Sequence, residues 1–176
     1  MKNREFAYCG LFGAAALLLP VLFHLIHLGH IFMPMYLPLV ALAFFVRPSM
    51  AALTALVVPL LSGAVTGMPP FYPPVAPVMA AELALMAMII GSLRFLFPRA
   101  SVLIILIPVL VIGRVVSAGL MYLAARLMEL PAKFIAGISF LSGWPGIILM
   151  IVTIPAIVRL SNSHAQTMET SKPNES

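Results

Sequence analysis

Long apolar runs separated by short polar breaks fill almost the whole chain. Their bounds are residues 6–26, 31–46, 48–66, 78–93, 100–125 and 134–158. A helix needs about 20 residues to cross the hydrocarbon core of a bilayer, and about 17–25 are common. Three of the runs are long enough alone, and the other three become so when flanking residues are included. The pattern therefore predicts an all-α integral membrane protein, built as a bundle of six transmembrane helices.

The predicted helices occupy residues 1–160, which we expect to form one domain. The second and fourth runs are the weakest of the six because both are short, and the second also contains Pro34 and Pro38. Residues 161–176 are polar and poor in apolar side chains, so we expect them to form a disordered cytoplasmic tail.

The composition agrees with a membrane protein and excludes a soluble one. Charged residues make up 9% of the chain and hydrophobic residues 62%, and the mean hydropathy is +1.13. Soluble domains carry about 25% charged residues. The net charge of +5 does not indicate nucleic-acid binding, because the basic residues are scattered singly between apolar runs. Cys9 is the only cysteine, so the chain can form no internal disulfide.

The positions of Lys and Arg predict the orientation of the bundle. If the N-terminus lies inside, seven basic residues fall on the inner side: Lys2, Arg4, Arg47, Arg94, Arg99, Arg159 and Lys172. Two fall on the outer side: Arg126 and Lys133. Cytoplasmic loops carry an excess of Lys and Arg, so we expect both termini to be cytoplasmic in a bacterial or archaeal cytoplasmic membrane. The loops at 27–32, 67–77 and 127–135 then face outward.

Two ionisable residues fall inside predicted spans. Glu82 lies five residues beyond Pro77, roughly 7–8 Å below the outer end of its helix. Arg114 lies thirteen residues from the inner end of the next helix, roughly 20 Å deep. Such groups are costly unless they pair or face a wet cavity, which makes both candidates for substrate binding. The alternative is a structural ion pair that ties the two helices together.

Histidines gather where the first span ends. His24, His27 and His30 recur every three residues, and Met33 follows them. This spacing places histidines on about one helical face, where they could hold an organic ligand or a metal ion. The alternatives are histidines that only meet water at the interface and a methionine that only fills the core. We expect ligand contact rather than a metal site.

Tyr36 and Trp144 are the aromatic candidates for stacking on a ring-shaped ligand. Both lie near the predicted outer interface, where aromatic residues occur whether or not a ligand binds. Trp144 lies within SGWPG, a sequence that would loosen or kink the sixth helix. The outer segment TGMPPFYPPVAP holds five prolines in twelve residues, so it is either a preformed lid or a stiff connector.

Small residues on the first helix could form a seam with another helix. Gly10 and Ala14 make a small-xxx-small pair, and Gly13 lies beside them. Such residues let helix backbones approach closely, either within the chain or toward a partner. The sequence shows no Walker motif, HExxH, GxSxG or CxxC, so we expect neither an enzyme nor a cofactor.

One long stretch resembles a known family. The run HIFMPMYLPLVALAFFVRPSMAALTALVVPLLSGAVTGMPPFYPPVAPVMAAEL, and within it the series LPLV, PLLSG, TGMPP and EL, resembles the substrate-binding S components of energy-coupling factor (ECF) transporters. These proteins import vitamins and related micronutrients. The resemblance covers about residues 7–95, and the last two helices match in hydropathy and position only.

The resemblance implies a substrate-binding subunit for a vitamin-like molecule, with a pocket that opens on the outer side. The pocket would be lined by outer loops and by the outer halves of helices four to six. It also implies a transmembrane coupling subunit, which docks on an Ala-xxx-Ala surface of helix one and associates with two cytoplasmic ATPases. The nearest match here is Gly10-xxx-Ala14. A metal-uptake subunit using the His/Met cluster and a membrane scaffold or assembly protein stay open as alternatives.

Overall fold

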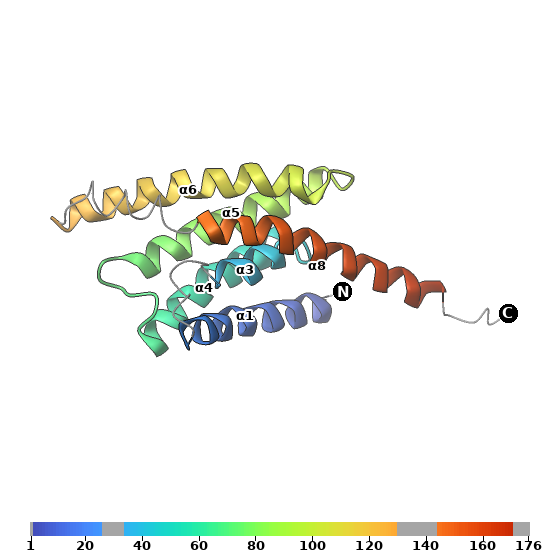
Figure 1. The fold of residues 1–176 in the computed structure, drawn as a ribbon, viewed down its shortest axis with the longest axis horizontal. Helices are drawn as coiled ribbons and strands as arrows, with labels where there is room; N and C mark the ends of the chain where they lie inside the picture. Colours follow the sequence, from blue (N-terminus) through green and yellow to red (C-terminus); the bar gives the residue numbers. More distant parts are fainter. Residues whose placement is uncertain (1, 26–33, 130–143, 171–176) are drawn as a thin grey trace.

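Helices packed side by side form an elongated bundle in the computed structural model (Figure 1). The structure describes residues 2–25, 34–129 and 144–170, and the side chains of 3–23, 34–129 and 144–161. The described helices are α1 (Lys2–Leu25), α3 (Tyr36–Leu42), α4 (Pro48–Thr66), α5 (Val75–Leu96), α6 (Val102–Leu127) and α8 (Trp144–Thr170). The described residues contain helices and turns but no strand, which confirms the all-α class.

Five of these helices are long and apolar enough to cross a membrane. The bounds of α1, α4, α5 and α6 lie within four residues of those of their predicted runs, and α4 matches its run at both ends. The described α8 begins ten residues after the start of the sixth run. The prediction of a sixth spanning helix over 31–46 is not confirmed, because the described part of this run contains only the seven-residue α3. At 1.5 Å per residue, α3 extends about 10 Å, which is too short to cross a bilayer alone.

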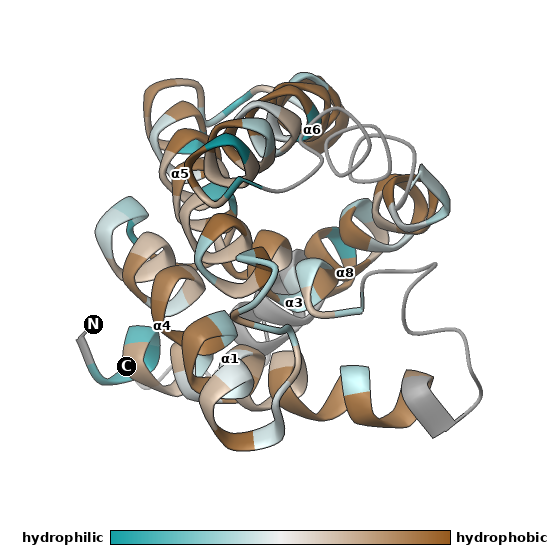
Figure 2. Ribbon diagram, turned by 90° about the vertical axis from the view of Figure 1, so that its left-hand side faces the viewer, coloured by the Kyte–Doolittle hydropathy of each residue, from teal (hydrophilic) through white to brown (hydrophobic). Residues whose placement is uncertain are grey.

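The α3 helix forms the centre of the packing. Its residues Leu39, Val40, Ala41 and Leu42 are at most 1% exposed, and it contacts α1, α4, α5 and α8. Figure 2, which looks along the bundle, shows the long helices arranged around it and apolar residues along most of their length. A short helix is stable here because the surrounding protein, rather than lipid, covers its ends.

The chain order brings many of the basic residues to one end of the bundle. The first turns of α1, the start of α4 and the last turns of α5 meet around one depression. We call this the basic end, because Arg4, Arg47, Arg94 and Arg99 lie in these segments or in the connection from α5 to α6. The segment 67–74 connects α4 and α5 at the opposite end (Figure 1). Antiparallel packing of consecutive helices therefore gathers these four basic residues at one end of the bundle.

Local sequence sets where several helices begin and end. Pro48 occupies the first turn of α4, where its missing N–H is not needed. Gly67 ends α4 in the left-handed conformation, with φ 75°, and its N–H donates to the Gly63 carbonyl. Ser101 caps α6, because its side-chain oxygen accepts a hydrogen bond from the Ile104 N–H at 3.3 Å.

The last helix extends beyond the predicted span. We expected no structure from residue 161 onward, but α8 continues to Thr170. The segment from 156 to 170 contains no glycine or proline, so nothing in it breaks the backbone hydrogen bonds of the helix. The polar residues 161–170 therefore extend a helix that the apolar part of α8 begins.

Candidate functional site

A cluster of polar side chains joins three helices inside the bundle. The Arg114 Nη2 on α6 donates to Glu82 Oε1 on α5 at 2.7 Å. The Tyr36 hydroxyl on α3 donates to the other carboxylate oxygen, Oε2, at 2.5 Å. The Arg114 guanidinium also lies over the Tyr36 ring, with its central carbon 5.0 Å from the ring centroid. The predicted pair is therefore present, and it has a third member.

This cluster is sealed within protein. The exposed fraction is 0% for Glu82, 3% for Arg114 and 4% for Tyr36. Ser117, one turn beyond Arg114, is 5% exposed, and its side chain interacts with Glu82. Within the described residues, no buried side-chain nitrogen or oxygen lacks a hydrogen-bond partner. The cluster thus contains one cation, Arg114, one anion, Glu82, and an uncharged tyrosine, so its net charge is zero.

A close approach of two helices places the pair. A Cβ added at Gly113, the residue before Arg114, would lie 2.5 Å from the Met86 sulfur on α5. Met86 lies one turn beyond Glu82 on the same helix. The small Gly113 leaves room for the Met86 side chain between α6 and α5, beside the Arg114–Glu82 pair.

The position of Tyr36 corrects one expectation. We expected Tyr36 near the outer interface with its ring available to a ligand, but its side chain is buried and its hydroxyl is bound to Glu82. The sequence placed Tyr36 near the outer end of a spanning helix over 31–46. The actual start of α3 at Tyr36 directs this side chain inward.

Trp144 lies at the first residue of α8 and is 41% exposed. The expected loosening of this helix is not seen in the described residues, because Pro145 falls in the first turn, where a proline is tolerated. The role of Trp144 as a stacking surface stays a prediction.

The histidine cluster falls mostly outside the described residues. His24 lies in the last turn of α1, but its side chain is not described. His27, His30 and Met33 lie outside the described residues altogether. Among the residues that the structure describes, no group of three His, Cys, Asp or Glu side chains could hold a metal ion. The ligand role of these four residues stays a prediction.

The small residues of α1 separate into two faces. Gly13 is buried, and a Cβ added there would lie 3.6 Å from Val58 and 3.8 Å from Thr54, both on α4. Gly10 and Ala14 are exposed, and a Cβ at Gly10 would meet nothing within 4 Å. Gly13 therefore serves packing within the chain, whereas Gly10 and Ala14 leave a shallow strip on the outside of the bundle.

The proline-rich segment is fastened to the end of α4. The Ser62 and Thr66 hydroxyls donate to the Met68 carbonyl at 2.6 Å and 3.1 Å. A Cβ at Gly63 would lie 2.7 Å from the Pro69 carbonyl oxygen, so the segment rests directly on the helix. These contacts favour a stiff connector over a lid that is free to move.

Sequence reasoning missed Ser117, Met86 and Gly113. The spacing of Arg114 and Ser117, one turn apart in an apolar helix, was a usable signal, because both residues had to face the same polar surroundings. No such signal marked Met86, since its contact depends on how α5 and α6 cross.

No family model, no curated protein and no solved structure matches this chain.

Proposed function

We propose that this protein is the membrane-embedded substrate-binding subunit of an ECF-type importer for a vitamin-like molecule. The observation that carries the proposal is the buried Tyr36–Glu82–Arg114 cluster, which joins three helices of a chain with only 9% charged residues. Ionisable groups at such depth are a default sign of substrate recognition in membrane proteins. The resemblance of residues 7–95 to the S components supplies the transport role.

The cluster has the chemistry to recognise a small polar ligand. Glu82 offers two acceptor oxygens, Arg114 offers several donors in one plane, and Tyr36 offers a ring and a hydroxyl. In the structure these three side chains form hydrogen bonds with one another. A ligand would therefore bind by replacing one of these internal contacts, and it would have to supply an equivalent hydrogen bond to avoid leaving a buried charge unpaired.

The outer face of α1 supports the proposed partner. The membrane span of α1 is the least enclosed of the five, with 11% of its window buried compared with 50% for α5. The exposed Gly10 and Ala14 would let a helix of the coupling subunit approach the α1 backbone closely. Transport would then be driven by the two ATPases that associate with that subunit.

The ligand-binding role is tested by identifying the small molecule that co-purifies with the protein, using mass spectrometry. We expect Glu82→Gln and Arg114→Ala to lose this molecule, whereas Arg126→Ala, a change of an exposed arginine, retains it. Because breaking the pair also destabilises the fold, only variants that keep a monodisperse, helical preparation are compared. Unchanged occupancy in both cluster variants would remove Glu82 and Arg114 from the binding site.

The partner role is tested by capture of the coupling subunit and the ATPases from co-expressing cells. Gly10→Leu should abolish capture and leave the bundle folded, because its side chain points away from every described neighbour. Gly13→Leu is the matched control, since its side chain would press against α4 and lower stability instead. Normal capture by Gly10→Leu would contradict this docking face.

A second candidate is a membrane scaffold or assembly protein that binds no substrate. The specific observation in its favour is that every member of the cluster already has an internal partner. A preparation that contains no bound molecule, and from which no coupling subunit is captured, would favour this function.

A further inference from the structure

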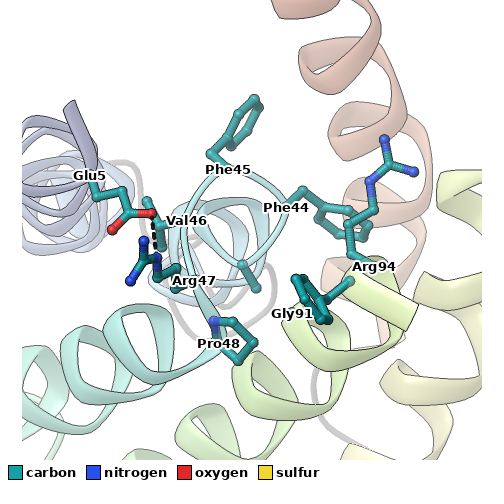
Figure 3. A pocket seen from close by; sticks show the side chains of 10 residues that line it. Glu5, Phe44, Phe45, Val46, Arg47, Pro48, Gly91 and Arg94 are labelled. Carbon is teal, nitrogen blue, oxygen red and sulfur yellow. Dashed lines mark ion pairs between the residues drawn. The ribbon is translucent and has the colours of Figure 1, made fainter. Parts of the chain in front are cut away.

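A depression of about 270 Å³ lies at the basic end, well away from the buried cluster. It lies between the first turns of α1, the connection from α3 to α4, and the last turns of α5 (Figure 3). Gly91 packs against Pro48, and this contact closes one wall between α4 and α5. The charged residues that line the depression are Glu5, Arg47 and Arg94.

The two arginines stand on opposite sides of the depression and keep donor groups available (Figure 3). Arg47 contacts Glu5 through Nε at 3.4 Å, and its side chain is 64% exposed. Arg94 donates through Nη1 to the Pro98 and Ala100 carbonyls at 2.8 Å and 3.3 Å, which fixes its position. Within the described part of the chain, both Nη groups of Arg47 and the Nη2 of Arg94 form no hydrogen bond.

The depression lies where the membrane spans end. Arg47 directly precedes the α4 span, and Arg94 lies in the last turn of the α5 span. Hydrocarbon gives way to lipid headgroups at this depth. Beside the depression, Phe95, Leu96 and Phe97 are 82%, 65% and 57% exposed, so an apolar surface adjoins the cationic one.

We propose that this depression binds the phosphate group of an anionic phospholipid, with Arg47 and Arg94 as hydrogen-bond donors. Two arginines against one glutamate leave a lining charge of +1, which a phosphate diester neutralises. Phe44 and Pro48 form apolar walls beside the headgroup, and Phe95 to Phe97 lie alongside the acyl chains. These apolar surfaces favour a lipid over a soluble anion, and basic pockets between spans are known to bind anionic headgroups.

The proposal is tested on the delipidated full-length protein in neutral detergent. The probes are dioleoyl-phosphatidylglycerol, dioleoyl-phosphatidylcholine with the same acyl chains, and inorganic phosphate, and bound lipid is counted by native mass spectrometry. We expect phosphatidylglycerol to bind more tightly than phosphatidylcholine, and Arg47→Gln to weaken its binding about fivefold. Arg126→Gln, an exposed arginine at the far end of α6, is the matched control and should change nothing.

Glu5→Gln should change phosphatidylglycerol binding in the direction opposite to Arg47→Gln. It removes the carboxylate that holds Arg47, so phosphatidylglycerol should bind more tightly to this variant. Arg94→Gln should also weaken binding, but Arg94 supports the end of α5, so Arg47→Gln and Glu5→Gln decide the result if that variant does not fold. Equal binding of the two lipids, equal losses for Arg47→Gln and Arg126→Gln, or displacement of the lipid by inorganic phosphate would each overturn the proposal.

Discussion

Arg114 shows at the scale of single residues how a buried charge is accommodated in this protein. Its guanidinium binds the Glu82 carboxylate and lies over the Tyr36 ring, and Glu82 takes a second hydrogen bond from the Tyr36 hydroxyl. The desolvation cost of two buried ions is offset only while all of these contacts are present. The stability of the pair therefore depends on both of its members at once.

Removal of one member should cost more than removal of both. Arg114→Met leaves Glu82 buried without its cation, so we expect the free energy of unfolding to fall by about 3–5 kcal/mol. The double variant Glu82→Met/Arg114→Met contains no buried charge and should lie closer to the wild type. The measurement is reversible unfolding in mixed micelles followed by circular dichroism, with Arg126→Met as an exposed control. A double variant as unstable as the sum of the single variants would contradict this account.

Sequence reasoning found this pair because charges are scarce in the chain. Glu82 and Arg114 stand out within apolar runs, and their computed depths placed them in the same half of the bundle. Tyr36 could not be assigned to them, because its partner lies 46 residues away and the contact depends on where α3 starts. Spacing along one helix can be read from a sequence, whereas the register between helices depends on packing.

At the scale of the elements, two helix crossings determine how the helices are arranged, and each has a glycine at the point of contact. Gly91 packs against Pro48 where α4 meets α5, and Gly113 packs against Met86 where α5 meets α6. Hydropathy predicted the bounds of α1, α4, α5 and α6 to within a few residues, because lipid imposes length and apolarity on a span. The span predicted over 31–46 is not confirmed, and its described part holds the short α3, which as a segment enclosed by protein does not have to match the bilayer thickness.

Gly113→Ala should disturb the candidate site through this crossing. The added methyl group would lie 2.5 Å from the Met86 sulfur, so we expect a cost of about 1–3 kcal/mol from overpacking. Met86→Ala in the same chain should recover part of the loss, because it removes the clashing atoms. Gly119→Ala on the same helix is the control, since nothing lies within 4 Å of its added Cβ.

A further comparison distinguishes two roles of Gly113. This residue either sets the distance between Arg114 and Glu82 or only allows α5 and α6 to pack. If Gly113 sets the distance between Arg114 and Glu82, Gly113→Ala should cost less in a Glu82→Met/Arg114→Met background than in the wild type. Unfolding measurements on the four proteins give this difference. Equal costs in both backgrounds would show that Gly113 acts on helix packing alone.

At the scale of the whole molecule, basic residues gather at one end of the bundle rather than along one side of it. Arg47 and Arg94 meet at one depression, and Arg99 lies in the connection directly beyond α5, whereas Arg126 lies in the last turn of α6. Several apolar helices indicate a multi-pass membrane protein. From the positive-inside rule we then expect the basic end to face the cytoplasm.

Cysteine labelling in intact cells tests this orientation. In a Cys9→Ser background, Tyr72→Cys should react with a membrane-impermeant maleimide, because Tyr72 is 66% exposed in the 67–74 segment. Arg99→Cys should react only after the cells are permeabilised. The opposite pattern of labelling would show that the basic end faces outward.

The buried position of α3 has a consequence for how the protein is made. A ribosome delivers α3 to the membrane early, but α4, α5 and α8, which enclose it, are synthesised later. Until they arrive, α1 is the one described neighbour that can cover the backbone ends of this seven-residue helix. The insertion machinery or the first span must therefore shelter this segment during translation, and the packing around α3 is in place only after α8 has been synthesised.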